Sequence, residues 1–377
     1  MNPAAPQSTS TNSQPLEIWQ YCANYPITSD LYAGRSRILF GTSDRQFHCL
    51  DPRTGKGWSL TTRGMGRTIS DAGDLIYLYV DCGLVHVINA KTHQHSAVID
   101  ISKTVGTTLE QYANLEYGRG SIESEILKNA YGENKSAVEA LTLWTCHEIF
   151  NHVAICTGSS SQKTSSVSAI DLNSNKKLWD LQLELPAPPL IVESKGRIFF
   201  ASLDHLVGIE TLTGKLLFKS RQVGVSSHSP AVNRDLIVWG ESRGKRFHCA
   251  SIDALESKWV YEARGDTLAH PAINYEYVCF CDHSGLFHCL EARTGRLICT
   301  FDLGSVVFGR PLIHRNAVYL GTVKGEFFAL DIARSRLIWK TTKPAAFPGI
   351  SIVLGNVLCF YYGNGSVCGV DLDASST

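Results

Sequence analysis

Three Phe-His-Cys triplets are the residues of this sequence that most resemble a set of metal ligands. They occupy residues 47–49, 247–249 and 287–289. Zinc binds His and Cys side chains, but each ligand atom must lie within about 2.0 to 2.3 Å of the ion. The triplets hold equivalent places in copies of a repeat, and copies on facing sheets would lie about 10 Å apart. We therefore expect the triplets to pack in the core, and we predict no metal site.

A second set of reactive side chains lies between the repeats, often just before a proline that opens the next β-rich run. Histidine can act as a general acid or base, and arginine can stabilise developing negative charge. A pocket made of such groups and aromatic rings would suit a polarised, partly apolar molecule. The alternative is that each side chain fills interior space or faces solvent. The candidate catalytic residues are His147, His228, His270 and Arg310, and the candidate ligand-binding residues are Tyr25, Arg67, Thr145, Phe308 and Phe347.

The elements that must position these residues are copies of one repeat. Each copy has a β-rich run, a polar hairpin, a second β-rich run that ends in an acid or Asn, and a turn, as in RILFGTSDRQFHCLDPRTG and YVCFCDHSGLFHCLEARTG. A period of about 40 residues is typical of a four-stranded propeller blade. The acid or Asn recurs with nearly this period, apart from one longer gap, at Asp51, Asn89, Asp171, Glu210, Asp253, Glu291, Asp331 and Asp371.

The turns and the flanking runs supply the remaining strands of each blade. Gly55, Gly214 and Gly295 stand where a short hairpin turn needs a positive φ. A further strand carries a bulky residue, and a short apolar strand precedes each copy. Eight copies predict an all-β fold, an eight-bladed β-propeller with four antiparallel strands per blade. The eighth copy lacks its last strand, so we expect the N-terminal strand at residues 16–21 to close the last blade.

The domain organisation follows from this repeat. We expect a flexible N-terminal tail at residues 1–15, a single β-propeller domain at residues 16–373 and a C-terminal tail at residues 374–377. The long gap holds an insertion at residues 101–142, which lacks strand alternation and reads as partly helical. The insertion joins two blades on the face where the linkers between blades meet, so we expect a lid over the mouth of the central channel. It could equally be a docking surface for another protein.

Composition excludes several classes of partner. Lys and Arg total 35, as do Asp and Glu, so the formal net charge is zero. A neutral chain offers no basic surface to a phosphate backbone, so we expect no nucleic-acid partner. The sequence has no stretch of about 18 apolar residues and no signal-like start, which predicts a cytoplasmic protein without a membrane partner. The twelve cysteines are then expected to be reduced and mostly buried.

The repeats resemble the PQQ-like repeat of the quinoprotein superfamily, in type nearest to BamB-like propellers and to the C-terminal propeller of the β-alanine-activating enzyme. The resemblance spans residues 16–21 and 37–373 and implies the fold. Dehydrogenases of this superfamily hold PQQ with Ca²⁺, usually beside two adjacent cysteines. This sequence has no Cys-Cys pair and no matching set of carboxylate and amide ligands. We therefore expect a quinoprotein-like propeller without the PQQ and calcium site, and no cofactor.

Two functions remain open at this point. The first is a propeller that binds a small molecule or a protein partner at the top mouth of its central channel. The alternative is a cofactor-independent enzyme of specialised metabolism, such as a cyclase, an isomerase or a Diels-Alder-type cycloaddition catalyst, that uses the same pocket. Such catalysis can come from holding a reactive guest in one near-attack shape while His or Arg polarises a carbonyl.

Overall fold

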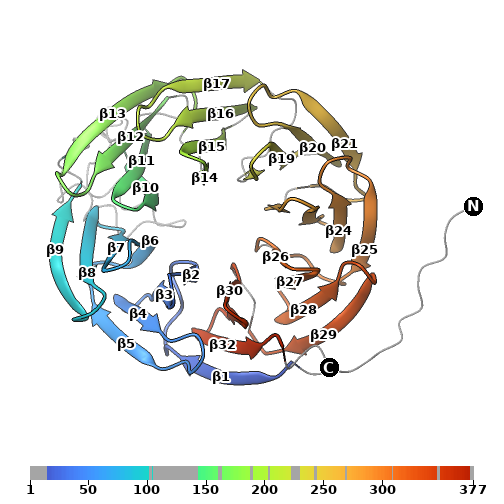
Figure 1. Ribbon diagram of the computed structural model, residues 1–377, viewed down its shortest axis with the longest axis horizontal. Helices are drawn as coiled ribbons and strands as arrows, with labels where there is room; N and C mark the ends of the chain where they lie inside the picture. Colours follow the sequence, from blue (N-terminus) through green and yellow to red (C-terminus); the bar gives the residue numbers. More distant parts are fainter. Residues whose placement is uncertain are drawn as a thin grey trace, which may run out of the picture. The chain divides into compact units, whose positions relative to one another are not determined.

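The computed structural model contains eight four-stranded antiparallel sheets (Figure 1). The residues that it describes are 15–101, 104, 143–159, 164–186, 190–202, 204–221, 230–241, 244–267, 270–307, 309–345 and 349–373. The protein is an all-β, eight-bladed β-propeller with four antiparallel strands per blade, as the repeat predicts. The chain divides into two compact units, which are described separately below: unit 1 is residues 1–22, 52–55 and 235–377, and unit 2 is residues 23–51 and 56–234.

Unit 2 holds four consecutive sheets, and in each the strands follow chain order from one edge to the other. The first is β2 (Tyr32–Ala33), β3 (Ile38–Gly41), β4 (Gln46–Leu50) and β5 (Gly57–Thr61), and the second is β6 (Gly66–Asp71), β7 (Leu75–Val80), β8 (Leu84–Asn89) and β9 (Gln94–Asp100). The third is β10 (Leu143–Phe150), β11 (Val153–Ser159), β12 (Ser165–Asp171) and β13 (Lys176–Leu183), and the fourth is β14 (Val192–Ser194), β15 (Arg197–Ser202), β16 (His205–Glu210) and β17 (Leu216–Arg221).

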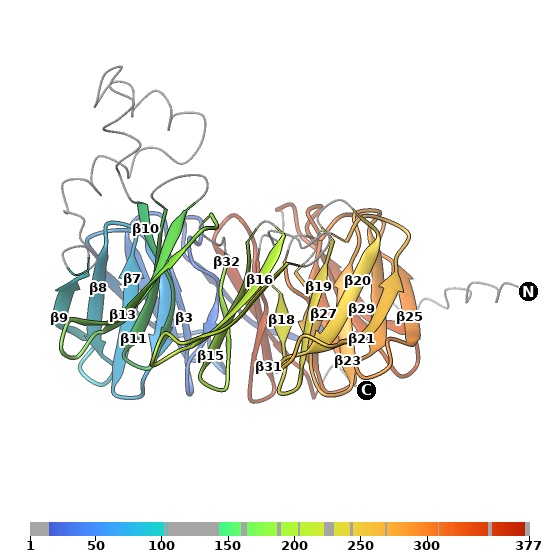
Figure 2. The same cartoon turned by 90° about the horizontal axis from the view of Figure 1, so that it is seen from above.

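Unit 1 holds three sheets built in the same way, except that the first strand of one of them, β18 (Ala231–Val232), falls within unit 2, and a fourth sheet that joins the two ends of the described chain. The three are β18 (Ala231–Val232), β19 (Leu236–Gly240), β20 (Arg246–Ser251) and β21 (Ser257–Glu262); β22 (Ala272–Ile273), β23 (Tyr277–Cys281), β24 (Leu286–Glu291) and β25 (Leu297–Asp302); and β26 (Leu312–His314), β27 (Ala317–Gly321), β28 (Glu326–Asp331) and β29 (Arg336–Thr342). Figure 2 shows the paired strands β20 and β21 side by side. The fourth is β1 (Glu17–Cys22), β32 (Ser366–Asp371), β31 (Val357–Tyr361) and β30 (Ile352–Leu354).

The pairing of β1 with β32 confirms the prediction that the N-terminal strand completes the last blade. The two strands are antiparallel, and Trp19 lies opposite Gly369. The Lys343 ammonium contacts the Glu17 carboxylate at 3.1 Å and the Gln20 side-chain oxygen at 3.2 Å, so it holds β1 to the end of β29. An edge strand supplied from elsewhere in the chain leaves fewer unpaired backbone groups on β32.

Three tryptophans each dock onto the turn of the following blade at a glycine. The indole Nε1 atoms of Trp19, Trp179 and Trp259 donate hydrogen bonds of 2.8 to 2.9 Å to backbone carbonyls in the turn of the following blade. A Cβ atom at Gly55, Gly214 or Gly295 would lie 2.5 to 2.9 Å from atoms of these indole rings, and all three glycines have positive φ. Glycine is therefore required both by the turn and by the docked ring.

Register explains why these tryptophans are unevenly spaced in the sequence. Trp58 pairs with Cys49, Trp259 with Cys249, and Trp179 with Ala169, so all three occupy the same place in their sheets. The prediction of the acid that ends the second β-rich run of each repeat is wrong in the fifth blade. Ser251, not Asp253, occupies that position. Ser251 closes its turn through a backbone hydrogen bond to Glu256, as Asp51 does to Lys56 and Glu291 to Arg296.

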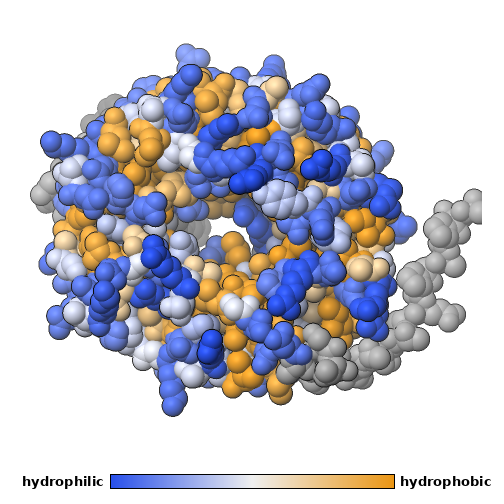
Figure 3. Space-filling view, in the orientation of Figure 1, coloured by the Kyte–Doolittle hydropathy of each residue, from blue (hydrophilic) through white to orange (hydrophobic). Residues whose placement is uncertain are grey.

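The core is apolar and lies between successive sheets. Phe47, Phe247 and Phe287 are fully buried, and all the cysteines except Cys22 and Cys299 are buried as free thiols. None of the described segments forms an apolar helix of the length that a bilayer requires. On the face drawn in Figure 3, hydrophilic and hydrophobic side chains are interspersed. Nearly all of the predicted insertion at residues 101–142, and with it the expected lid, lies outside the described residues, as do residues 1–14 and 374–377.

Candidate functional site

One predicted ligand-binding residue, Arg67, and one predicted catalytic residue, His147, occupy β-bulges on the strands β6 and β10 of unit 2. The register of β6 shifts between Gly66 and Thr68, which leaves Arg67 as the extra residue. The register of β10 shifts between Cys146 and Glu148, which leaves His147 as the extra residue. Bulges re-aim a side chain away from the regular alternation of a strand and often border functional sites.

Side-chain hydrogen bonds around these bulges join β6 to β10 and join β6 to the segment that precedes β2. The Thr68 hydroxyl donates to the Cys146 carbonyl at 2.9 Å, so Arg67 and His147 flank one bond between β6 and β10. The Thr28 hydroxyl donates to the Gly66 carbonyl at 2.9 Å and so links the segment after Tyr25 to β6. We call the set Tyr25, Arg67 and His147 the inner-strand site.

Each bulged side chain is held by a polar partner in its own blade. One terminal nitrogen of Arg67 contacts the Asp81 carboxylate at 3.2 Å, and the same carboxylate accepts the backbone N–H of Met65 at 2.9 Å. The Arg67 side chain is 28% exposed. His147 Nε2 and the Thr157 hydroxyl share a hydrogen bond of 2.6 Å, and Thr157 is buried. A guanidinium and an imidazole held this way can bind a carboxylate or polarise a carbonyl oxygen.

The close approach of the first two blades depends on glycine. A Cβ atom at Gly41 would lie 2.8 Å from the Cα atom of Gly66, and a Cβ atom at Gly66 would lie 3.1 Å from the Cα atom of Gly41. Any larger residue at either position would push β6 away from β3. Because β6 carries the bulge, these two glycines set where Arg67 stands relative to the first blade.

For the other predicted site residues, the structure gives only a position in the chain or a degree of burial, and three of them lie outside the described residues. Thr145 lies on β10 opposite Thr157, and Tyr25 is about half exposed at the start of the first blade. His270 and Arg310 belong to unit 1, where both are partly buried in the segments that lead into β22 and β26. His228, Phe308 and Phe347 lie outside the described residues. That all nine side chains meet at one channel mouth therefore stays a prediction.

The histidines of the Phe-His-Cys triplets each pack inside their own blade, in agreement with the packing interpretation. His48, His248 and His288 stack on Phe40, Trp239 and Phe280 of the adjacent strand, with ring centroids 4.8 to 5.2 Å apart. Among the described residues, no three or more His, Cys, Asp or Glu side chains are grouped as metal ligands.

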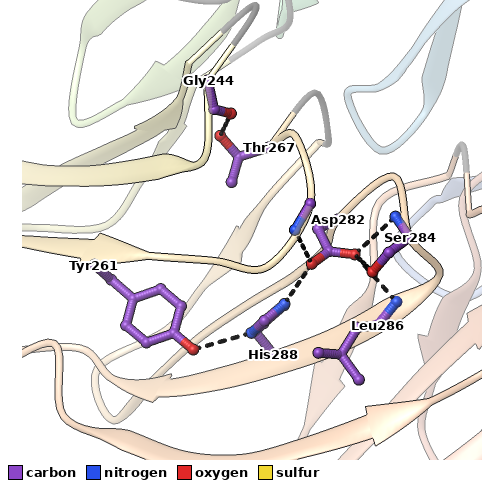
Figure 4. A network of polar contacts seen from close by, with 8 residues as sticks. Gly244, Tyr261, Thr267, Asp282, Ser284, Leu286 and His288 are labelled. Atoms are coloured by element: carbon purple, nitrogen blue, oxygen red, sulfur yellow. Dashed lines mark hydrogen bonds and ion pairs between the residues drawn. The ribbon is translucent and has the colours of Figure 1, made fainter.

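A buried polar network surrounds one of these histidines (Figure 4). His288 Nε2 contacts the Asp282 carboxylate at 3.0 Å, and its Nδ1 shares a hydrogen bond of 3.1 Å with the Tyr261 hydroxyl. Asp282 also accepts the backbone N–H groups of Gly265 and Ser284, each at 2.9 Å. No role for Asp282 was predicted from the sequence. Its position six residues before His288, across a hairpin, could have indicated that the two side chains pair.

Burial and hydrogen bonding set the pKa values in this network. Burial lowers the pKa of His288, against the opposing effect of Asp282. Burial would raise the pKa of Asp282, but hydrogen bonds from Ser284, His288 and Gly265 outweigh it and lower that pKa. Burial raises the pKa of Tyr261. The network is sealed, because His288 and Asp282 are at most 1% exposed, so we assign it to stability rather than to ligand binding.

Comparison with known proteins agrees with the fold. A family model described as "Outer membrane protein assembly factor BamB" matches residues 163–274 and 268–377, more than half of the chain. The chain belongs to this family of PQQ-like propellers. Among curated proteins, none is significantly similar in sequence to it.

Solved structures show the same architecture at low sequence identity. BamB from Moraxella catarrhalis superposes with a TM-score of 0.67 at 13% identity, over 95% of this chain and 100% of that one. The computationally designed Ika8 protein gives 0.68 at 13% identity, over 94% and 99%. Saccharomyces cerevisiae Sqt1 gives 0.66 at 10% identity, over 95% and 99%. At such identities the likeness establishes the fold alone.

The described residues of this PQQ-like propeller do not fit PQQ with calcium. A hard cation needs six or more oxygen ligands, and no cluster of carboxylates is present among the described residues. The sequence also has no pair of adjacent cysteines. Among the described residues, the inner-strand site is instead the one that groups a guanidinium and an imidazole on bulged strands.

Proposed function

We propose that this propeller binds a small molecule through a carboxylate group at the inner-strand site. The observation that carries the proposal is the position of Arg67 and His147, two bulged residues that flank the hydrogen bond between Thr68 and Cys146. Both side chains can donate to an anionic oxygen, and Arg67 can do so with a forked pair of N–H groups.

Arg67 has donor capacity beyond its ion pair. Among the described residues, no acceptor lies in hydrogen-bonding geometry with its buried Nε atom. A buried donor without an acceptor costs free energy, which a ligand oxygen would recover once the guanidinium shifts toward it. Asp81 fixes one end of the guanidinium, and the exposed part of the Arg67 side chain is what a guest would meet first. The proposal extends to the mouth of the channel, where Tyr25 would supply an aromatic surface.

The test is a titration with small carboxylates, namely acetate, succinate and benzoate, followed by calorimetry or by NMR. We expect Arg67→Ala to weaken binding at least tenfold and His147→Ala to weaken it severalfold. Arg246→Ala is the matched control, because Arg246 also pairs with an acid, Glu241, at 2.9 Å but stands in unit 1. Equal binding by wild type and Arg67→Ala, or no binding by wild type, would overturn the proposal.

A cofactor-independent enzyme is the second candidate, favoured by the 2.6 Å hydrogen bond between His147 and Thr157. A histidine oriented by a buried hydroxyl can transfer a proton to or from a bound carbonyl compound. Cyclases and isomerases need no more than this together with a shaped pocket. The test is turnover of a candidate substrate. A kcat that falls in His147→Gln while KM stays unchanged would favour catalysis over binding alone.

A further inference from the structure

The second blade breaks the rule that pairs a docked tryptophan with a turn glycine. The residue that follows β8 in the place of Gly55, Gly214 and Gly295 is His93, which has a φ of 60°. The side chain that should dock there is Trp58, which holds the same place as Trp19 and Trp179. Its indole stacks instead on the His93 ring, with centroids 4.6 Å apart and planes 18° apart.

The other described turns follow the rule. Where the last strand of a blade has another residue at the tryptophan place, the turn of the next blade has a residue other than glycine at the glycine place. Ala97 is followed in this way by Asn175, and Cys299 by Ser335. Among the described turns that receive a tryptophan, only the turn of the second blade has a residue with a side chain at this place, and the turn after Trp339 lies outside the described residues. A Cβ atom in such a turn cannot coexist with a docked indole, so His93 holds Trp58 away from the turn backbone.

A pocket of about 360 Å³ lies beside the displaced ring, between the first and second blades of unit 2. Its floor is the buried pair Cys49 and Leu50, and one wall is Trp58 with His93. The remaining lining is polar and comes mainly from Ser36, Arg37, Asp51, Lys56, Asp74 and Lys91. The volume is in the range of small-molecule sites.

The charges of this pocket balance one another. Arg37 is bound to the Asp71 carboxylate at 3.0 Å and donates to the Gly73 carbonyl at 2.9 Å. Lys91 contacts the Asp74 carboxylate at 2.9 Å. The pocket therefore offers many donors and acceptors with little net charge, next to an aromatic wall. Neither an anion nor a cation would find an uncompensated partner there.

We propose that this Trp58–His93 pocket binds a neutral polyhydroxylated molecule, namely a sugar. Sugar hydroxyls both donate and accept hydrogen bonds, which suits carboxylates and ammonium groups standing side by side. The C–H face of a pyranose ring is apolar and packs against an aromatic ring. The site is independent of the inner-strand site, because it is built from the turns at the opposite ends of the blade strands.

The experiment measures binding of methyl glycosides of neutral hexoses and of N-acetylhexosamines by saturation-transfer NMR and calorimetry. We expect binding by wild type and at least a tenfold loss in His93→Gly, since glycine lets Trp58 dock and fill the pocket. Asn175→Gly makes the same kind of change in the next turn of unit 2 and should bind as wild type does. Trp58→Ala removes the aromatic wall and should also lose binding.

Three results would overturn the proposal. The first is no saturation transfer to any glycoside, and the second is unchanged binding in both His93→Gly and Trp58→Ala. The third is stronger binding of benzoate or inorganic phosphate than of glycosides in wild type, with that binding lost in His93→Gly. A crystal structure of His93→Gly provides a readout without ligand, because the Trp58 indole should then donate to the turn backbone of the second blade.

Discussion

The indole of Trp179 occupies the space that a Cβ atom at Gly214 would need, with ring atoms 2.5 to 2.8 Å from that position. The same indole donates to the Thr211 carbonyl at 2.9 Å. Two blades of unit 2 are thereby joined through one ring, one turn and one hydrogen bond. The contact links a residue in the last strand of one blade to the turn before the last strand of the next.

We expect Gly214→Ala to destabilise unit 2 by roughly 2 to 4 kcal/mol, because it adds a clash to the strain of a positive φ. Gly196→Ala is a matched control. Gly196 has a φ of 72°, close to the 71° of Gly214, but no atom lies within 4 Å of its Cβ position. The control should cost only about 1 kcal/mol. Urea denaturation of both variants measures the difference, and equal losses would mean that the docked indole contributes nothing.

The stability of unit 2 should fall in mild acid because of two histidines. Burial lowers the pKa of His48 to about 4 and that of His86 to about 4. Between their ordinary pKa of about 6.5 and pH 4, the unfolded chain binds protons that the folded chain does not. The free energy of unfolding should be constant above this window and fall within it by roughly 1 kcal/mol per pH unit for each histidine.

Denaturation midpoints measured from pH 7.5 to pH 4 check this expectation. His48→Gln can keep the hydrogen bond to the Thr42 hydroxyl, which is 3.1 Å from His48 Nε2, without the titrating group. Its slope should be about half that of wild type. A slope equal to that of wild type would assign the acid sensitivity to other groups.

Removing one partner of the buried pair Asp282 and His288 should cost more than removing both. Asp282→Ala leaves the His288 ring buried without its acceptor, with an expected loss of 3 to 5 kcal/mol as an order of magnitude. The blade formed by β26 to β29 has Thr322 and Phe328 at these two places. The double variant D282T/H288F should therefore recover much of the loss. Thermal unfolding of the two single variants and the double variant completes the cycle.

Lys343 should protect β1 from proteolysis more than it raises overall stability. Its contacts to Glu17 and Gln20 are partly exposed, so Lys343→Met should cost at most about 1 kcal/mol. Chymotrypsin should nevertheless cut faster at Trp19 and Tyr21 in this variant. Lys340→Met is the control, because Lys340 pairs with Glu326 of its own blade at 2.8 Å. Equal cleavage rates would show that Lys343 does not hold the strand.

The repeat could be read from the sequence because each blade encodes its own strands and turn. The pairing of β1 with β32 followed from counting strands in the eighth copy. The bulges at Arg67 and His147 could not be predicted, since a bulge depends on the register of the neighbouring strand. His93 was visible as the residue in the glycine place, but its effect on Trp58 appears only when the strands are paired. Ser251 was missed because the neighbouring repeats have an acid at this position, Glu210 and Glu291, so the nearby Asp253 was aligned with them.

The pairing of β1 with β32 has a consequence for synthesis of the protein. The ribosome synthesises β1 before β2 to β31 and synthesises its partner β32 after them, so the nascent chain must carry an unpaired strand while the intervening blades are made. Contacts between such distant segments form late and slowly. Until they form, β1 and the three-stranded sheet that awaits it are free to pair with another copy or to engage a chaperone.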